Sequence, residues 1–155
     1  MSEQRATTSP SAEAEVAQPE ASVERWASLV AERKADLDDW YQGWDEATCS
    51  GLASAAVDCN LMLSSASFIA QTNDIVVAGA SFEEGNTYLG AVPDEIADLY
   101  SDTIALTGAA VEAGAAWTDA GCGIGDEGDC IGLAVEFERA MDAVKSKFEA
   151  WSPYL

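Results

Sequence analysis

The feature that most constrains this chain is a pattern of one tryptophan and two cysteines that occurs twice. The first copy, WDEATCSGLASAAVDCNLML, starts at Trp44, and the second, WTDAGCGIGDEGDCIGLA, starts at Trp117. In each copy the first cysteine follows the tryptophan by five positions, an aspartate stands directly before the second cysteine, and an apolar run follows. Because the frame recurs in both halves of the chain, we expect each cysteine pair to have the same local role.

The cysteines are Cys49, Cys59, Cys122 and Cys130, an even number that is compatible with two disulfides and an oxidising compartment. Four cysteines allow three connectivities, which sequence alone does not distinguish. Four separate reduced thiols are an alternative, and zinc is disfavoured because its cysteine ligands usually occur in closely spaced pairs. The repeated frame favours the pairs Cys49–Cys59 and Cys122–Cys130, each of which would contribute roughly 2–3 kcal/mol by restricting the unfolded chain.

Residues 1–22 consist mostly of Ser, Ala, Glu, Gln, Thr and Pro and show no apolar periodicity. This composition predicts a disordered tether, with the folded domain over residues 23–155. A tether of this kind before a disulfide-bearing domain resembles the mature region of bacterial lipoproteins, which implies export with Met1 in the place of the lipidated cysteine. The Ala-rich, Lys-poor, acidic composition is similar to that of actinobacterial envelope proteins. We therefore expect an extracytoplasmic protein, secreted or anchored to the outer face of the cytoplasmic membrane.

Four segments have the apolar spacing of amphipathic helices, with large side chains alternately three and four residues apart. We expect helices over residues 23–47, 53–80, 93–119 and 129–151. Ser22 is the expected N-cap of the first helix. The β-branched residues of 74–80 would also suit a strand, but the helical period continues through them. Four such helices with a cysteine pair at two corners predict an all-α, up-down-up-down four-helix bundle stapled by two local disulfides.

The second expected helix has no charged side chain between residues 59 and 73 and carries two apolar stripes. They consist of Val57, Leu61, Phe68 and Ile75, and beside these of Met62, Ile69 and Val76. A helix this apolar should be buried on more than one side. We therefore expect it to be the central core element, so that Phe68→Ala would cost roughly 3–5 kcal/mol. If a stripe contacts a partner or ligand instead, Met62, Phe68 and Ile69 are the candidate residues.

One charged residue, Arg33, interrupts the otherwise apolar seam of the first helix and is a further candidate for a ligand or partner contact. Buried, it would need a carboxylate such as Asp58, Asp74 or Glu138; otherwise its head group reaches the solvated rim. Every tryptophan also falls on a seam position, and we expect all five in the core: Trp26, Trp40, Trp44, Trp117 and Trp151.

Charge and missing residue types disfavour several functions. The chain has 28 acidic and 7 basic residues, for a formal net charge of −21. Nucleic acids and anionic membrane faces are disfavoured partners because both attract basic surfaces. No window reaches the roughly 20 apolar residues that span a bilayer. The chain has no histidine, which excludes a His-dependent triad or metal site, and the common phosphate-binding and nucleophile motifs are absent.

The acidic clusters are weak metal candidates. Asp94, Asp98 and Asp102 share one helix face, and the acids of residues 126–129 do not have EF-hand spacing. We expect no metal, no cofactor and no enzymatic activity. The function that fits best is a non-enzymatic binding or accessory subunit that docks on an envelope or membrane protein complex. The alternative is a carrier that holds a small apolar ligand between its helices.

Overall fold

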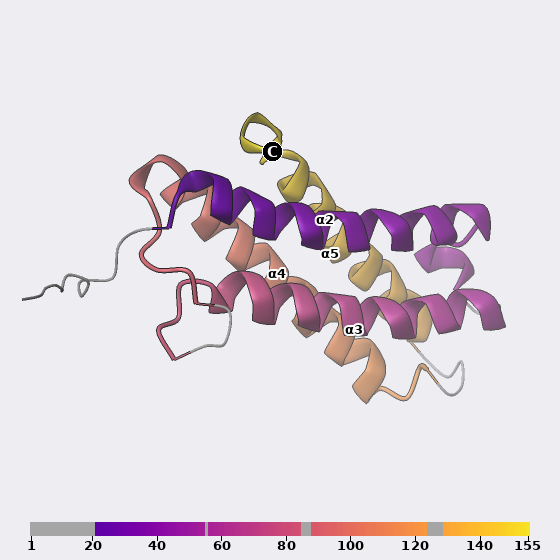
Figure 1. Ribbon diagram of the computed structural model, residues 1–155. Helices are drawn as coiled ribbons and strands as arrows, with labels where there is room; N and C mark the ends of the chain where they lie inside the picture. Colours follow the sequence, from indigo (N-terminus) through magenta and orange to yellow (C-terminus); the bar gives the residue numbers. More distant parts are fainter. Residues whose placement is uncertain (1–20, 55, 85–87, 124–128) are drawn as a thin grey trace, which may run out of the picture.

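The computed structural model describes residues 21–54, 56–84, 88–123 and 129–155, and over these residues its regular structure is entirely helical (Figure 1). Four long helices and three short 3-10 segments follow one another in the described residues in the order α2 (Val23–Glu46), η1 (Gly51–Ala53), α3 (Val57–Gly79), η2 (Asp94–Ile96), α4 (Ala97–Asp119), α5 (Cys130–Glu149) and η3 (Ser152–Tyr154). Residues 74–79, for which a strand was the alternative, belong to α3. The expected tether lies outside the described residues, apart from Ala21 and Ser22.

The long helices form the predicted up-down-up-down bundle (Figure 1). Helix α2 packs on α3 and α5, and α4 packs on the same two helices. Because consecutive helices are antiparallel, the α2–α3 and α4–α5 corners lie at one end of the bundle and the α3–α4 connection lies at the other. At that other end, Ser22 caps α2 as predicted, and its hydroxyl accepts a hydrogen bond from the Arg25 N–H at 3.3 Å.

Each of the two neighbouring corners contains one of the predicted disulfides. Cys49 is bonded to Cys59 and Cys122 to Cys130, and both pairs have Cα atoms 5.5 Å apart. No cysteine is left free. The first disulfide joins the end of α2 to the first turn of α3, and the second joins the end of α4 to the first residue of α5. The two pairs therefore hold the same position in their respective helical hairpins.

The repeated spacing of tryptophan and cysteine follows from how α2 and α4 end. The Cys49 N–H donates to the Trp44 carbonyl at 3.0 Å, and the Cys122 N–H donates to the Trp117 carbonyl at 3.3 Å. The residues before the two cysteines, Thr48 and Gly121, have positive φ angles of 54° and 80°. These are the two marks of a Schellman motif, which joins residues five positions apart across the end of a helix. The Trp-x4-Cys frame is thus a helix-ending motif used twice.

Each corner is also bound to the opposite hairpin. The Glu138 carboxylate of α5 accepts hydrogen bonds from the Gly51 N–H at 2.8 Å and from the Trp44 indole N–H at 2.9 Å. A Cβ atom on Gly51 would lie only 2.6 Å from the Val135 Cα, so η1 packs directly on the α5 backbone. At the second corner, the Asn60 amide of α3 donates to the Cys122 carbonyl at 3.1 Å.

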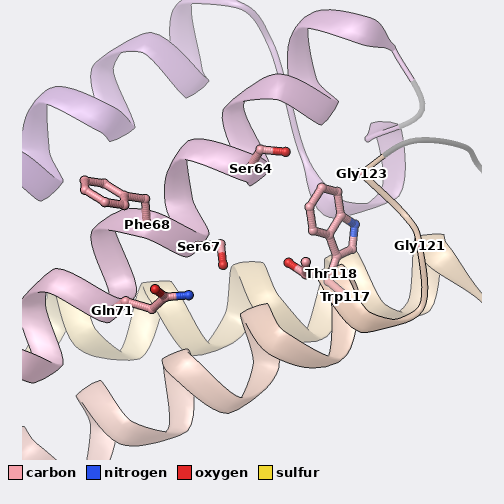
Figure 2. Close-up of a pocket in the computed structure, with 8 residues that line it drawn as sticks. All are labelled: Ser64, Ser67, Phe68, Gln71, Trp117, Thr118, Gly121 and Gly123. Carbon is pink, nitrogen blue, oxygen red and sulfur yellow. The ribbon is translucent and has the colours of Figure 1, made fainter.

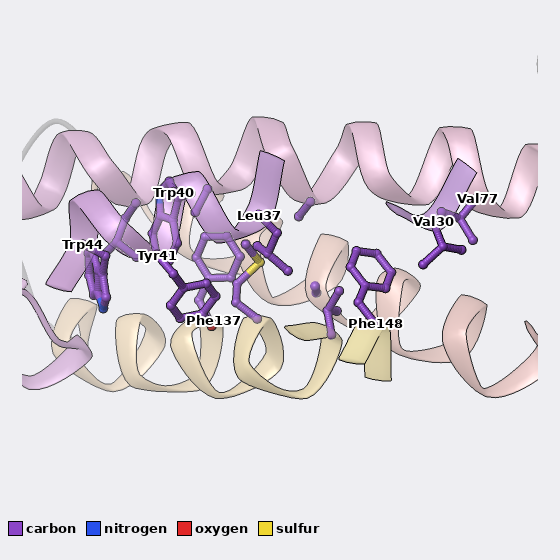
Figure 3. Close-up of a cluster of buried hydrophobic side chains, with 14 of the residues drawn as sticks. Val30, Leu37, Trp40, Tyr41, Trp44, Val77, Phe137 and Phe148 are labelled. Atoms are coloured by element: carbon purple, nitrogen blue, oxygen red, sulfur yellow. The ribbon is translucent and has the colours of Figure 1, made fainter. Parts of the chain in front are cut away.

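Large aromatic side chains fill the core between α2 and α5 (Figure 3). All five tryptophans are buried, as predicted. Trp40 stacks on Trp44 with ring centroids 4.9 Å apart, and its indole N–H donates to the Met62 carbonyl of α3 at 2.8 Å. The Trp151 indole donates to the Thr103 hydroxyl of α4 at 3.0 Å. Trp40, Trp44 and Trp151 therefore connect helices through hydrogen bonds as well as through apolar contact.

The expectation that the α3 stripe Val57, Leu61, Phe68 and Ile75 lies in the core is wrong. These side chains are 73%, 61%, 71% and 67% exposed. The buried face of α3 consists instead of Cys59, Leu63, Ala66, Ala70, Asn73 and Val77. Its small side chains let the backbone approach the neighbouring helices closely, and a bundle helix buries one face only. At Phe68 the expected cost of the alanine substitution therefore falls to about 1 kcal/mol or less.

Candidate functional site

Exposed apolar side chains are concentrated along α3. Eight large apolar side chains are exposed among the described residues, and six of them lie on α3 or directly beside it. Those six are Leu52, Val57, Leu61, Phe68, Ile75 and Phe82. We call the four that lie within the helix, Val57, Leu61, Phe68 and Ile75, the α3 ridge. Exposed large apolar side chains gathered on one helix of a charged protein mark a candidate site of interaction.

The α3 ridge is nearly straight because of its spacing. Leu61, Phe68 and Ile75 are seven residues apart, and Phe82 continues the interval just beyond the helix. An α-helix rotates by only about 20° over seven residues, so such side chains form one line along its surface. From Val57 to Ile75 this line is about 27 Å long. Between Leu61 and Ile75 the ridge thus has one large apolar side chain every two helical turns, with Ser64, Ser65, Gln71 and Thr72 between them.

One groove follows the α4 side of the ridge (Figure 2). It has a volume of about 520 Å³ and is lined by Ser64, Ser67, Phe68, Gln71, Trp117, Thr118, Gly121 and Gly123. Trp117 stands at one end beside the second disulfide corner, and Phe68 lies toward the other end. The Trp117 ring would lie 3.4 Å from a Cβ atom on Gly123, so the corner loop leaves little free space against this ring. Trp117 is buried, as expected, and its ring also lines this groove.

A second groove follows the α2 side of the ridge. It has a volume of about 440 Å³ and is lined by Asp36, Asp39, Trp40, Gly43, Met62, Ser65 and Ile69. On α3, Met62 and Ile69 are apolar and half-buried and Ser65 is exposed, whereas the α2 edge carries two carboxylates. Asp36 pairs with Arg33, and Asp39 is exposed with no cationic partner among the described residues. These two acids could be singled out only once α2 and α3 were known to be neighbours.

The candidate residues from the sequence therefore fall in three places. Phe68 borders the α3–α4 groove, whereas Met62 and Ile69 border the α2–α3 groove. Arg33 lines neither groove; its guanidinium lies 2.8 Å from the Asp36 carboxylate, and its side chain is 18% exposed. The expected carboxylate partners of a buried Arg33 do not contact it, because Asp36 is within reach one turn away on the same helix. Asp74 accepts a hydrogen bond from Thr107 at 2.8 Å instead.

The charge around the ridge is of one sign. No lysine or arginine occurs between Lys34 and Arg139, a stretch that contains all of α3 and α4. The ridge side chains themselves are uncharged, and the α3 sequence has no ionisable residue other than cysteine from Cys59 to Asn73. Helices α3 and α4 therefore contribute no basic side chain to this surface, and the ion pair of Arg33 with Asp36 lies on α2.

The described residues contain no group of three or more His, Cys, Asp or Glu side chains that could hold a metal ion. The acidic segment 126–129 lies outside them, except for Asp129. None of the helices in the described part of the chain combines the length and apolarity needed to cross a membrane. No protein-family model, curated protein or solved structure matches this chain.

Proposed function

We propose that the protein is a non-enzymatic binding or accessory subunit, exported to the bacterial cell envelope, that docks on a partner protein through the outer face of α3. The observation that carries this proposal is the α3 ridge itself. Four large apolar side chains, each more than 60% exposed, follow one line on a chain with a formal net charge of −21. Each Å² of this apolar surface that a partner removes from water would stabilise the complex by about 25 cal/mol.

The location part of the proposal rests on the disulfides. Two disulfides and no free cysteine are consistent with a non-cytoplasmic protein, because cytosolic reductants keep thiols reduced. The composition of the first 22 residues, which resembles that of lipoproteins after the lipidated cysteine, supports attachment at the envelope. Fractionation of the bacterium that encodes the protein tests this part, and recovery in the cytoplasm would contradict it.

A carrier function remains the second candidate because of the α3–α4 groove. Its volume of about 520 Å³ is within the range of small-molecule sites, and it has aromatic residues, Phe68 and Trp117, toward its two ends. The groove lies on the outside of the bundle between two helices. A carrier would therefore hold its ligand against the surface of α3 rather than inside the four-helix core.

Photocrosslinking from the ridge tests the docking function. Phe68 is replaced by p-benzoylphenylalanine, which keeps an aromatic ring at this exposed position, and the envelope is irradiated in the bacterium that encodes the protein. Ile131 on α5, also apolar and 48% exposed, is the matched control position. We expect a defined protein adduct from position 68 and none from position 131. The absence of an adduct from position 68, together with uptake of Nile red that Phe68→Ser abolishes, would reject docking in favour of the carrier.

A further inference from the structure

The charges around the α3 ridge restrict which protein can bind it. Asp58 is exposed at the start of α3, and Asp36 and Asp39 border the α2–α3 groove. Asp36 is paired with Arg33, whereas Asp39 and Asp58 have no basic partner among the described residues, and α3 and α4 contain no lysine or arginine. An apolar ridge with acids at its edges is complementary to an apolar helix with basic flanks.

We propose that the α3 ridge binds an amphipathic helix of a partner protein, one whose apolar side chains recur every seven residues and whose flanks carry Lys and Arg. The inference rests on the proposed docking function and names the chemistry of the partner. A seven-residue interval on both helices keeps the two apolar lines in register as they wind around each other. The small side chains between the ridge positions, Ser64 and Ser65 among them, leave room for the partner's side chains.

Two other occupants are disfavoured by the same charges. A second copy of this chain would bring a further formal charge of −21 and the same acidic edges, so a symmetric pairing through α3 places like charges opposite each other. An anionic lipid surface would repel the acids in the same way. An amphipathic helix with basic flanks would bury the apolar ridge and place its cations beside the acids at the edge.

Binding of two synthetic helices to the full chain tests the inference. Both peptides have about three heptads with leucine at the seam positions. One carries lysine at the flanking positions, and the other carries glutamate at the same positions. Affinity is measured by fluorescence anisotropy for the wild type, for Leu61→Ser and Phe68→Ser on the ridge, and for the matched control Ile131→Ser. All three substituted side chains are exposed, so each variant should keep the circular dichroism and melting temperature of the wild type.

We expect the lysine-flanked peptide to bind, with an affinity about tenfold lower in each ridge variant and unchanged in Ile131→Ser. Raising the salt concentration should weaken this binding, because the charges at the edge are exposed. Equal binding of the glutamate-flanked peptide would refute the charge argument. Equal binding of the lysine-flanked peptide to all variants would show non-specific attraction to an acidic protein and would refute the site.

Further outcomes separate this inference from the function on which it rests. A wild-type dimer in sedimentation equilibrium that Phe68→Ser dissociates would assign the ridge to a second copy and overturn the inference. Ridge-dependent binding to uncharged phosphatidylcholine vesicles would overturn it in favour of a lipid surface. A specific adduct from position 68 in the envelope, without binding of the lysine-flanked peptide, would leave the docking function standing and reject the basic helix alone.

Discussion

Thr48 and Gly121 occupy the same position in the two Schellman motifs, and exchanging their residue types should move stability in opposite directions. Both have positive φ, 54° at Thr48 and 80° at Gly121. A left-handed conformation costs a residue with a side chain about 1–2 kcal/mol, and glycine adopts it without this strain. Glycine also increases the entropy of the unfolded chain, which offsets about 0.4–1 kcal/mol. We therefore expect Thr48→Gly to raise the free energy of unfolding by about 0.5–1 kcal/mol, and Gly121→Ala to lower it by a similar amount.

The structure isolates the backbone contribution at both positions. A Cβ atom on Gly121 would have no other atom within 4 Å, so alanine there adds no collision. Thr48 is exposed, and within the described residues its side chain makes one hydrogen bond, to the Ala47 carbonyl, which is exposed as well. Urea unfolding of the oxidised proteins, followed by circular dichroism at 222 nm, measures both changes at constant m-value. A loss of stability in Thr48→Gly would refute the assignment of strain to this corner.

Three further predictions concern the interior. In α4, Gly114→Ala should lower the free energy of unfolding by about 1–3 kcal/mol, because its Cβ atom would lie 2.9 Å from the Phe137 ring. Gly108→Ala should raise the free energy of unfolding by about 0.5–1 kcal/mol, because the nearest atom to its Cβ would be 3.9 Å away. Both alanine variants are measured by urea titration, and a change of the same sign in both would contradict the packing argument. Asn73→Leu should raise the melting temperature, because burying an amide with no hydrogen-bond partner among the described residues costs about 1–3 kcal/mol; a lower value would show that the amide is paired. Burial and the hydrogen bond to Asp142 raise the pKa of Tyr41 above its ordinary 10.0, so the folded state keeps a proton that the unfolded state releases. The resulting contribution to the stability of the fold is fully present below pH 10.0 and is lost as pH rises above it. Tyr41→Phe should therefore flatten the alkaline fall in melting temperature, and an equal slope of melting temperature against pH in the wild type and the variant would contradict this.

The buried residues could be predicted from the sequence where large side chains occupy the seam positions of a helix. In α2 the aromatic and aliphatic residues occupy the seam, and Trp26, Trp40 and Trp44 are buried as predicted. The paired corners could also be predicted, because a helix ending and a disulfide both depend on residues close together in the sequence. The hydrogen bonds that produce the Trp-x4-Cys spacing could not be read from it, since they depend on the backbone angles at Thr48 and Gly121.

For α3 the sequence predicted the wrong buried face, because the largest side chains do not lie on the side of the helix that packs in the core. Ala66 and Ala70 are consecutive members of the buried face, which recurs at three- and four-residue spacing, and their small size hid this pattern beside Leu61 and Phe68. An apolar helix face predicts burial against something, and the sequence does not say whether that is the chain's own core or another molecule. The candidate residues Met62, Phe68 and Ile69 could thus be named in advance, but not their division between two grooves.

The pairing of each cysteine with the next one along the chain affects how the protein can be oxidised. The bonded cysteines are separated by 10 and 8 positions, and neither disulfide encloses the other. A chain that emerges N-terminus first presents Cys59 as the first available partner of Cys49, well before Cys122 appears. Thiol–disulfide exchange favours thiols that are accessible to each other, so the first bond to form at each corner is the native one. When each cysteine pairs with the next one along the chain, oxidation of the four thiols gives the native bonds without rearrangement.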